Sequence, residues 1–308
     1  MKPHPQVLAL LEAAASSPLP TLDKVSPFVA RRLYRERCAR VMPKAPKAMT
    51  RLLVSAEGIA LRAYRPMGTA RDRLPALVFF HGGGWSIGDL DTHDVLCRQL
   101  ANGARCAVFS VEYRLAPEAP FPAAVEDCLA ATDFVLQQED FLTIDASRVA
   151  VGGDSAGGNL AAVVAISLKE KIAFQLLIYP ATDQRLGSAS LARNGEGYLL
   201  TRRLMETFRG YYLPRREDLL DWRASPLLAQ SLAGLPPAFL LTAGFDPLLD
   251  EGRAYVERLA REGTEVAYRE YPDMVHGFIV MGGVLDTANA AVEDCCTALR
   301  RQFEKVPA

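Results

Sequence analysis

The sequence predicts a doubly wound α/β fold, in which a mostly parallel central sheet carries helices on both faces. Three observations support this fold class. Short apolar runs recur along the chain, and they are continuous instead of alternating, as strands covered on both faces must be. Stretches with a helical pattern separate these runs, where crossover connections belong. The chain has 308 residues, half of them apolar, which is enough to bury a large core.

The predicted strands follow each other at intervals that leave room for a helix between most of them. In chain order the strands are residues 76–80, 106–111, 148–152, 174–179, 238–242 and 265–271. The predicted helices are residues 121–138, 157–169, 248–262 and 285–303. Residues 52–54 and 63–64 are candidates for earlier strands, with Gly58 at a hairpin turn, and so is the stretch from Lys24 onwards.

Two segments fall outside this alternation, and the first covers residues 1–50. It has the pattern of two helices, the second with Ser26 as its cap and Pro27 at its first position. That helix is rich in arginine, which we interpret as a solvated face instead of an anion-binding face. The arginines are Arg31, Arg32, Arg35, Arg37 and Arg40.

The second segment, residues 183–225, is inserted between two predicted strands. Its helix begins near Thr201 and places Leu204, Phe208 and Tyr212 on one face. One interpretation is a helix that packs on the main core. We favour a second interpretation, in which this face lines a substrate pocket.

We therefore expect a helical cap over a catalytic core. The cap consists of residues 1–50 and 183–225, and the core consists of residues 51–182 and 226–308. The candidate pocket residues are Trp85, Asp154, Leu204, Phe208 and Phe278.

Charge and hydropathy exclude several classes of partner. The formal net charge of −1 supplies no field for nucleic acid or an acidic membrane, and no apolar run approaches the ~20 residues that span a bilayer. Near the N-terminus, the apolar run Val7–Leu11 ends at Glu12, which is too short for a signal peptide. We expect a cytoplasmic protein with a small-molecule substrate, and we name a second copy of the chain as a candidate partner.

The cysteines and histidines do not have metal-ligand spacing. The six cysteines lack the C-x-x-C pattern, so we expect reduced thiols that fill small apolar spaces. The four histidines lack patterns such as H-E-x-x-H. We expect no metal and no cofactor.

The most informative motif is Gly153-Asp154-Ser155-Ala156-Gly157, between a predicted strand and a predicted helix. A sharp strand-to-helix turn pushes the central serine out of the backbone, and glycines on either side leave room for the neighbouring strand and helix. We interpret Ser155 as a nucleophile.

A serine nucleophile needs a base, and histidine titrates near neutrality. His4 lies in a proline-rich terminus, His81 precedes three glycines, and His93 precedes a helix, which it caps or decorates. His276 follows the last predicted strand and precedes a glycine. We choose His276 as the base.

A carboxylate must orient that base. Asp246 lies outside the carboxyl end of a predicted strand, where the sites of open α/β sheets occur. Asp250 is expected one turn into the next helix, and Asp273 is close to His276 along the chain. We choose Asp246, which also fits the chain order serine, aspartate, histidine.

The tetrahedral intermediate needs hydrogen-bond donors for its oxyanion. The glycines Gly82, Gly83 and Gly84 follow a buried strand and expose backbone N–H groups. The Ala156 N–H, at the start of the helix that follows Ser155, adds another donor. A glycine run can also cradle phosphate, but neither G-x-x-x-x-G-K nor a dinucleotide-binding fingerprint is present.

These motifs coincide with those of a known family: the chain resembles the hormone-sensitive-lipase-like esterases, or bacterial family IV, of the α/β-hydrolase superfamily. The matching motifs are His81-Gly82-Gly83-Gly84-Trp85, Tyr113-Arg114-Leu115-Ala116-Pro117-Glu118, Gly153-Asp154-Ser155-Ala156-Gly157-Gly158-Asn159-Leu160-Ala161, Asp246-Pro247-Leu248-Leu249-Asp250-Glu251-Gly252 and His276-Gly277-Phe278. The resemblance covers the chain from about residue 52 to its end. It implies the α/β-hydrolase fold with a helical cap. It also implies hydrolysis of short- to medium-chain acyl esters by Ser155, His276 and Asp246, with Gly83, Gly84 and Ala156 donating to the oxyanion.

Two other functions remain open at this stage. The same acyl-transfer machinery would serve an amide or formamide hydrolase, such as an arylformamidase. Some relatives are small-molecule receptors, but those are expected to lack a member of the triad, and this chain has all three.

Overall fold

An eight-stranded sheet forms the centre of the computed structural model, which describes residues 2–55 and 57–305. The strand order is β1-β2-β4-β3-β5-β6-β7-β8. The strands are β1 (Met49–Val54), β2 (Ala60–Arg65), β3 (Leu74–Phe80), β4 (Ala107–Glu112), β5 (Ile144–Asp154), β6 (Phe174–Ile178), β7 (Ala238–Phe245) and β8 (Val266–Val275). The pairs β1–β2 and β2–β4 are antiparallel, and all other pairs are parallel.

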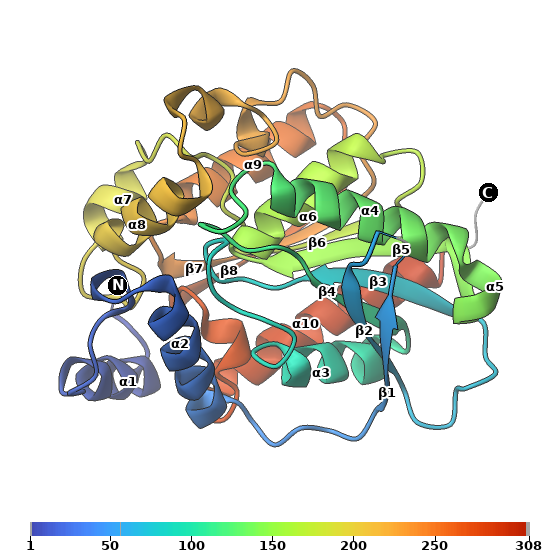
Figure 1. Cartoon of the computed structure of the whole chain (residues 1–308), viewed down its shortest axis with the longest axis horizontal. Coiled ribbons are helices and arrows are strands. Elements are labelled where there is room, and N and C mark those ends of the chain that lie inside the picture. Colours follow the sequence, from blue (N-terminus) through green and yellow to red (C-terminus); the bar gives the residue numbers. More distant parts are fainter. Residues whose placement is uncertain (1, 56, 306–308) are drawn as a thin grey trace.

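Helices cover both faces of this sheet (Figure 1). On one face lie α4 (Ala123–Gln137), α6 (Ala156–Ser167) and α9 (Leu249–Arg261), and on the other lie α3 (Asp94–Ala104) and α10 (Asp286–Phe303). A short helix, α5 (Glu139–Leu142), follows α4. The predicted fold class, a doubly wound and mostly parallel sheet, is confirmed.

Strand β3 shows why its sequence is apolar without interruption. Ala76, Val78 and Phe80 pack in the hydrophobic cluster under α4 and α6, whereas Leu77 and Phe79 pack in the cluster under α3 and α10. All five side chains are buried. Because successive side chains of a strand point to opposite faces, a strand covered on both sides needs an apolar residue at every position.

Some element boundaries differ from the predicted ones. Strand β8 continues to Val275, so His276 follows the strand directly instead of lying well inside a loop. Gly58 has a φ of +82° between β1 and β2, as a turn there requires. The stretch from Lys24 onwards is not a strand, because Ser26 caps a helix there by accepting a hydrogen bond from Val29 N.

The two segments outside the alternation form four helices at one end of the sheet (Figure 1). They are α1 (Pro5–Ala15), α2 (Pro27–Val41), α7 (Ala189–Asn194) and α8 (Arg202–Tyr212). Short 3₁₀ turns lie at Leu22–Lys24, Arg216–Leu220, Pro226–Leu228 and Phe278–Val280. A small apolar cluster joins α2 to α8, and it contains Leu22, Ala30, Leu33, Ile87 and Phe208.

The arginines of α2 do not all form a solvated face. The Arg31 guanidinium donates to the carbonyls of Ser86 and Ala116 and pairs with Glu118. Arg35 pairs with Asp89 at 2.9 Å. These arginines therefore fasten α2 to the loops that follow β3 and β4, a role that the spacing of the arginines along the helix does not reveal.

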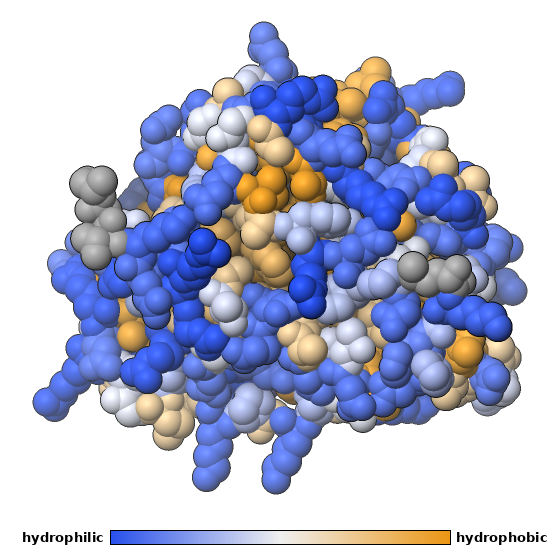
Figure 2. Space-filling view, turned by 180° about the vertical axis from the view of Figure 1, so that it is seen from behind, coloured by the Kyte–Doolittle hydropathy of each residue, from blue (hydrophilic) through white to orange (hydrophobic). Residues whose placement is uncertain are grey.

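The surface of the protein is mainly polar on the face shown in Figure 2, and the cysteines lie in the core. The face behind the view of Figure 1 is mainly polar, with an apolar area near its middle (Figure 2). No helix among the described residues has both the length and the apolar character needed to cross a membrane. All six cysteines are buried and free, and burial raises the pKa of the Cys38 thiol to about 12.

Two helical glycines provide a test of this packing. A methyl group at Gly157 in α6 would overlap the Phe80 carbonyl, whereas a methyl group at Gly210 in α8 would meet no atom. We expect Gly157→Ala to lower the free energy of unfolding by about 1–3 kcal/mol and Gly210→Ala to raise it by up to about 1 kcal/mol. Urea unfolding followed by circular dichroism measures both, and shifts of the same sign would contradict the packing described.

Candidate active site

Ser155 lies at a sharp bend between the end of β5 and the start of α6. Its backbone has φ 56° and ψ −116°, a conformation that is strained for any residue except glycine. Methyl groups at Gly153 or Gly157 would overlap the Phe80 carbonyl, so the bend needs both glycines. Ser155 N donates to Ile178 O at 2.9 Å, which fixes the bend against β6.

His276 faces this serine from the end of β8. Its Nε2 atom is 2.8 Å from Ser155 Oγ, and its Nδ1 atom is 2.7 Å from Asp246 Oδ2. The Tyr179 ring packs against the imidazole, with 4.7 Å between ring centroids. The imidazole is therefore held between a hydroxyl and a carboxylate.

Asp246, the residue after β7, is fully buried. Its Oδ1 atom accepts from Leu248 N at 2.8 Å, which leaves Oδ2 for His276. Its two competitors lie elsewhere. Asp250 accepts from Ser190 N and pairs with Arg193, and Asp273 is a residue of β8 itself.

The three side chains thus come from the ends of β5, β7 and β8, on the carboxyl side of the sheet. The chain of two short hydrogen bonds allows the serine proton to pass to the imidazole while the carboxylate stabilises the resulting positive charge.

The glycine-rich loop after β3 turns tightly beside the serine. The Gly83 carbonyl accepts from Ser86 N and Ile87 N at 3.1 and 2.9 Å. Among the described residues, the N–H groups of Gly83, Gly84 and Ala156 donate to no other protein group. These three donors remain free for an oxyanion.

Gly82 differs from the other candidate donors of this loop. Its N–H donates to Asp154 Oδ1 at 2.9 Å and is therefore not available for an oxyanion. Asp154 is 4% exposed, so its side chain supports the loop from inside the protein. It does not line the pocket, contrary to our expectation from the sequence.

A buried pair between Asp154 and His93 completes this support. His93 Nε2 lies 3.0 Å from Asp154 Oδ1, and both side chains are buried. Burial alone would raise the pKa of Asp154, but the charge and hydrogen bond of His93 and the Gly82 N–H hold it below its usual value. His93 precedes α3 as predicted, yet its side chain does not cap that helix. No local pattern in the sequence distinguishes these two orientations.

His81 is the second buried histidine beneath the loop. Its ring stacks on that of Tyr113, with 4.3 Å between ring centroids, and Tyr113 Oη donates to the His81 carbonyl at 2.7 Å. Burial, followed by the nearby charge of His93, lowers the pKa of His81 to about 4. A neutral ring donates from Nδ1 to Gly82 O at 2.9 Å.

The other candidate pocket residues lie in different surroundings. Phe208 of α8 lies so close over Gly84 that a methyl group there would overlap its ring, and Leu204 is partly buried one turn before it. Trp85 stacks face to face on Tyr212, with 4.5 Å between ring centroids. Phe278 is fully buried against Tyr179 and Tyr271, so its side chain is not exposed to a pocket as we expected.

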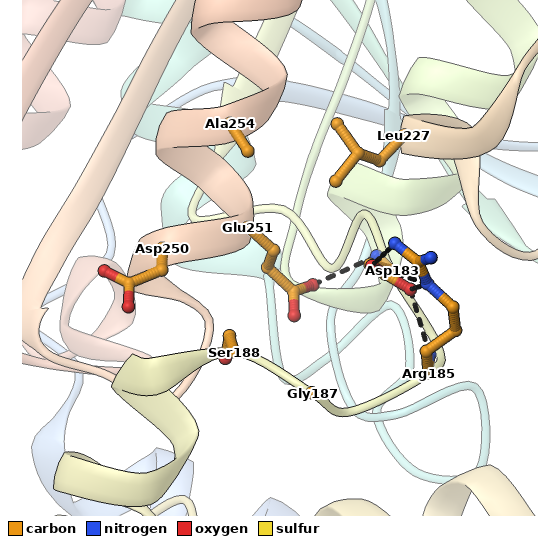
Figure 3. Close-up of a pocket in the computed structure, with 8 residues that line it drawn as sticks. All are labelled: Asp183, Arg185, Gly187, Ser188, Leu227, Asp250, Glu251 and Ala254. Carbon is orange, nitrogen blue, oxygen red and sulfur yellow. Dashed lines mark hydrogen bonds and ion pairs between the residues drawn. The ribbon is translucent and has the colours of Figure 1, made fainter.

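A separate cavity of about 520 Å³ lies beside α9 and the chain that follows β6 (Figure 3). Its lining residues are Asp183, Arg185, Gly187, Ser188, Leu227, Asp250, Glu251 and Ala254. Asp183 pairs with Arg185, and the Glu251 carboxylate accepts from the backbone of Thr182 and Asp183. The cavity contains none of Ser155, Asp246 and His276, so we assign it no part in the chemistry.

Comparison with known proteins identifies close relatives. Residues 77–280 match a family described as having the alpha/beta hydrolase fold. The chain is 45% identical to the carboxylic ester hydrolase LipN of Mycobacterium tuberculosis over 80% of this chain and 68% of that protein. It is 38% identical to the ethyl acetate hydrolase of Pseudomonas putida over 89% of this chain and 90% of that protein.

Solved structures agree. An ester hydrolase from the metagenome of Lake Arreo, complexed with a derivative of bipyridine phosphonate, superposes with a TM-score of 0.94 at 41% identity, covering 99% of this chain and 100% of the other. A hyperthermophilic esterase from Pyrobaculum calidifontis superposes with a TM-score of 0.91 at 35% identity, covering 98% and 99%.

The lowered pKa of His81 has a measurable consequence for stability. Unfolded histidine titrates near ~6.5, so between about 6.5 and about 4 the unfolded chain binds more protons at this position than the folded chain. As the pH is lowered across this interval, the wild-type free energy of unfolding should therefore fall by an extra ~3 kcal/mol. The His81→Gln variant should not show this extra loss. Urea unfolding at several pH values gives both curves, and parallel curves would disprove the buried neutral state of His81.

Proposed function

Because the chain belongs to the hormone-sensitive-lipase-like esterases of the α/β-hydrolase superfamily, we propose that it hydrolyses short- to medium-chain acyl esters as a serine carboxylesterase. The observation that carries the proposal is the hydrogen-bond chain from Ser155 through His276 to Asp246, at 2.8 and 2.7 Å. The relatives are ester hydrolases by name, which favours esters over amides and formamides as substrates. The presence of all three groups in contact argues against a receptor without catalysis.

The proposed reaction has two halves. Ser155 Oγ attacks the ester carbonyl while His276 Nε2 takes the hydroxyl proton, and the oxyanion accepts hydrogen bonds from Gly83, Gly84 and Ala156. His276 then gives the proton to the departing alcohol, which leaves an acyl group on Ser155. In the second half a water molecule attacks the acyl group while His276 takes a proton from it, and His276 then gives this proton to Ser155 Oγ as the bond to the acyl group breaks. The carboxylic acid is released and free Ser155 is restored.

We propose that residues 1–50 and 183–225 form the cap of this enzyme. The apolar cluster between α2 and α8, and the hydrogen bonds of Arg31 to the loops after β3 and β4, support this division. Phe208 on α8 covers Gly84 and is the proposed contact between the cap and the substrate.

Location and assembly are further parts of the proposal. Six free and buried cysteines suit a reducing compartment, so we propose a cytoplasmic location. We also propose a homodimer, since β8 ends the sheet and has no strand on its outer side among the described residues.

A phosphonate that reacts with serine tests the nucleophile. We expect it to add to Ser155 and to abolish hydrolysis of p-nitrophenyl esters, with the rates of the untreated enzyme highest for short acyl chains. Peptide mass spectrometry locates the adduct. Labelling of another serine, together with full activity in Ser155→Ala, would exclude the proposed role of Ser155.

Three asparagine substitutions test which carboxylate orients the base. Asp246→Asn keeps the shape but favours the wrong imidazole tautomer, so kcat should fall by a factor on the order of 10⁴. Asp250→Asn and Asp273→Asn serve as matched controls and should lose far less. Steady-state kinetics on folded variants decides the matter, because a large loss in Asp273→Asn with near wild-type kcat in Asp246→Asn would reassign the acid.

A further inference from the structure

Helix α7 is hydrogen-bonded to the loop that carries Asp246. The Asn194 side-chain amide donates to Gly244 O and to Asp246 O, each at 3.1 Å. Asn194 is 7% exposed, and it comes from the segment between β6 and β7, not from the strands that carry the triad. The Nδ2 atom must face these carbonyls, because only an N–H₂ group can donate to two acceptors.

One of these carbonyls, that of Gly244, lies at a break in the register of the β-sheet. The β7–β8 ladder loses its register between the pairs Ala243↔Tyr271 and Phe245↔Val275, and Gly244 lies in this gap. On the other side of β7, the ladder with β6 ends at Leu241. Asn194 supplies a hydrogen-bond donor to this carbonyl, and the loss of a donor at a buried carbonyl costs about 1–3 kcal/mol.

This irregularity lies immediately before the proposed catalytic acid. Irregular strand pairing often occurs beside active sites, where it redirects a side chain. Here, the single residue Gly244 of β7 faces residues 272–274 of β8, and just beyond this gap Asp246 Oδ2 lies 2.7 Å from His276 Nδ1. The donor that stabilises this irregularity therefore helps to set the direction of the carboxylate.

Further contacts hold α7 against the same loop. Ser190 is fully buried, and its Oγ atom donates to Pro247 O at 2.7 Å and accepts from Asp250 N at 3.1 Å. The Asp250 carboxylate in turn accepts from Ser190 N at 2.6 Å. Ser188 and Asp250 line the cavity beside this contact (Figure 3). These contacts anchor the helix, so that the Asn194 amide has a defined place.

We propose that Asn194 is a positioning residue for the reaction: its amide holds the backbone of Gly244 and Asp246 so that the Asp246 carboxylate meets His276. The inference rests on the proposed function, because it assumes that Asp246 orients the base. The Asn194 amide donates to the backbone of Gly244 and Asp246 and to neither Ser155 nor His276, so it acts through Asp246.

The isosteric variant Asn194→Asp separates donation from packing. It keeps the shape of the side chain but turns two carboxylate oxygens toward two carbonyl oxygens. We expect kcat to fall by about 10- to 100-fold, since a small misplacement of a catalytic group has an effect of this size, and KM to change by less than about twofold. Asn194→Ala should behave in the same way.

The matched control is Asn102→Ala, which removes an asparagine amide that donates to the Lys47 carbonyl far from the triad. We expect wild-type kcat in this variant. The proton between His276 Nδ1 and Asp246 should give a low-field NMR signal in the wild type and in the control. In the Asn194 variants that signal should weaken or shift, which a general loss of stability would not cause in folded protein at low temperature.

The outcomes are distinct. Wild-type kcat and an unchanged low-field signal in folded Asn194→Asp or Asn194→Ala would overturn the inference. Asp246→Asn is measured beside them: if that variant stays active, the proposed triad itself is wrong. If Asp246→Asn is inactive and the Asn194 variants are not, only the role of Asn194 fails.

Discussion

The close approach of α6 to the end of β3 is the constraint on which the candidate site depends. At Gly153 and Gly157 no side chain separates the sharp bend at Ser155 from the Phe80 carbonyl. Because β3 continues directly into the glycine-rich loop, this contact brings the bend at Ser155 against the start of that loop. A side chain at Gly153 or Gly157 would push Ser155, the proposed nucleophile, away from the proposed oxyanion donors.

A buried charge joins the same two pieces of chain. Asp154 precedes Ser155, and its carboxylate accepts from Gly82 N and pairs with His93. A carboxylate in such a place is costly unless it is paired and hydrogen-bonded, and here both conditions hold. The two buried histidines have different tasks: His81 is neutral and packs on Tyr113, whereas His93 Nε2 lies 3.0 Å from the Asp154 carboxylate.

The segment between β6 and β7 covers the site and also supports it. Its helix α8 places Phe208 over Gly84, and its helix α7 binds the loop that carries Asp246. A change of sequence in this segment can therefore alter the shape of the pocket and the direction of the carboxylate together. This coupling follows from the hydrogen bonds that the Asn194 amide donates to Gly244 O, at the break in the β7–β8 ladder, and to Asp246 O.

The sequence by itself determined where most strands lie along the chain and where several helices begin, because these features depend on residues a few positions away. Ser26 and Thr201, for example, cap α2 and α8 through amides three residues further on. Tertiary structure alone decided the inward orientation of His93, the use of Gly82 N–H by Asp154 and the place of Asn194. Gly82 and Asp154 are 72 positions apart in the chain. The partners of buried polar groups are chosen by the packing of distant elements, which no local pattern records.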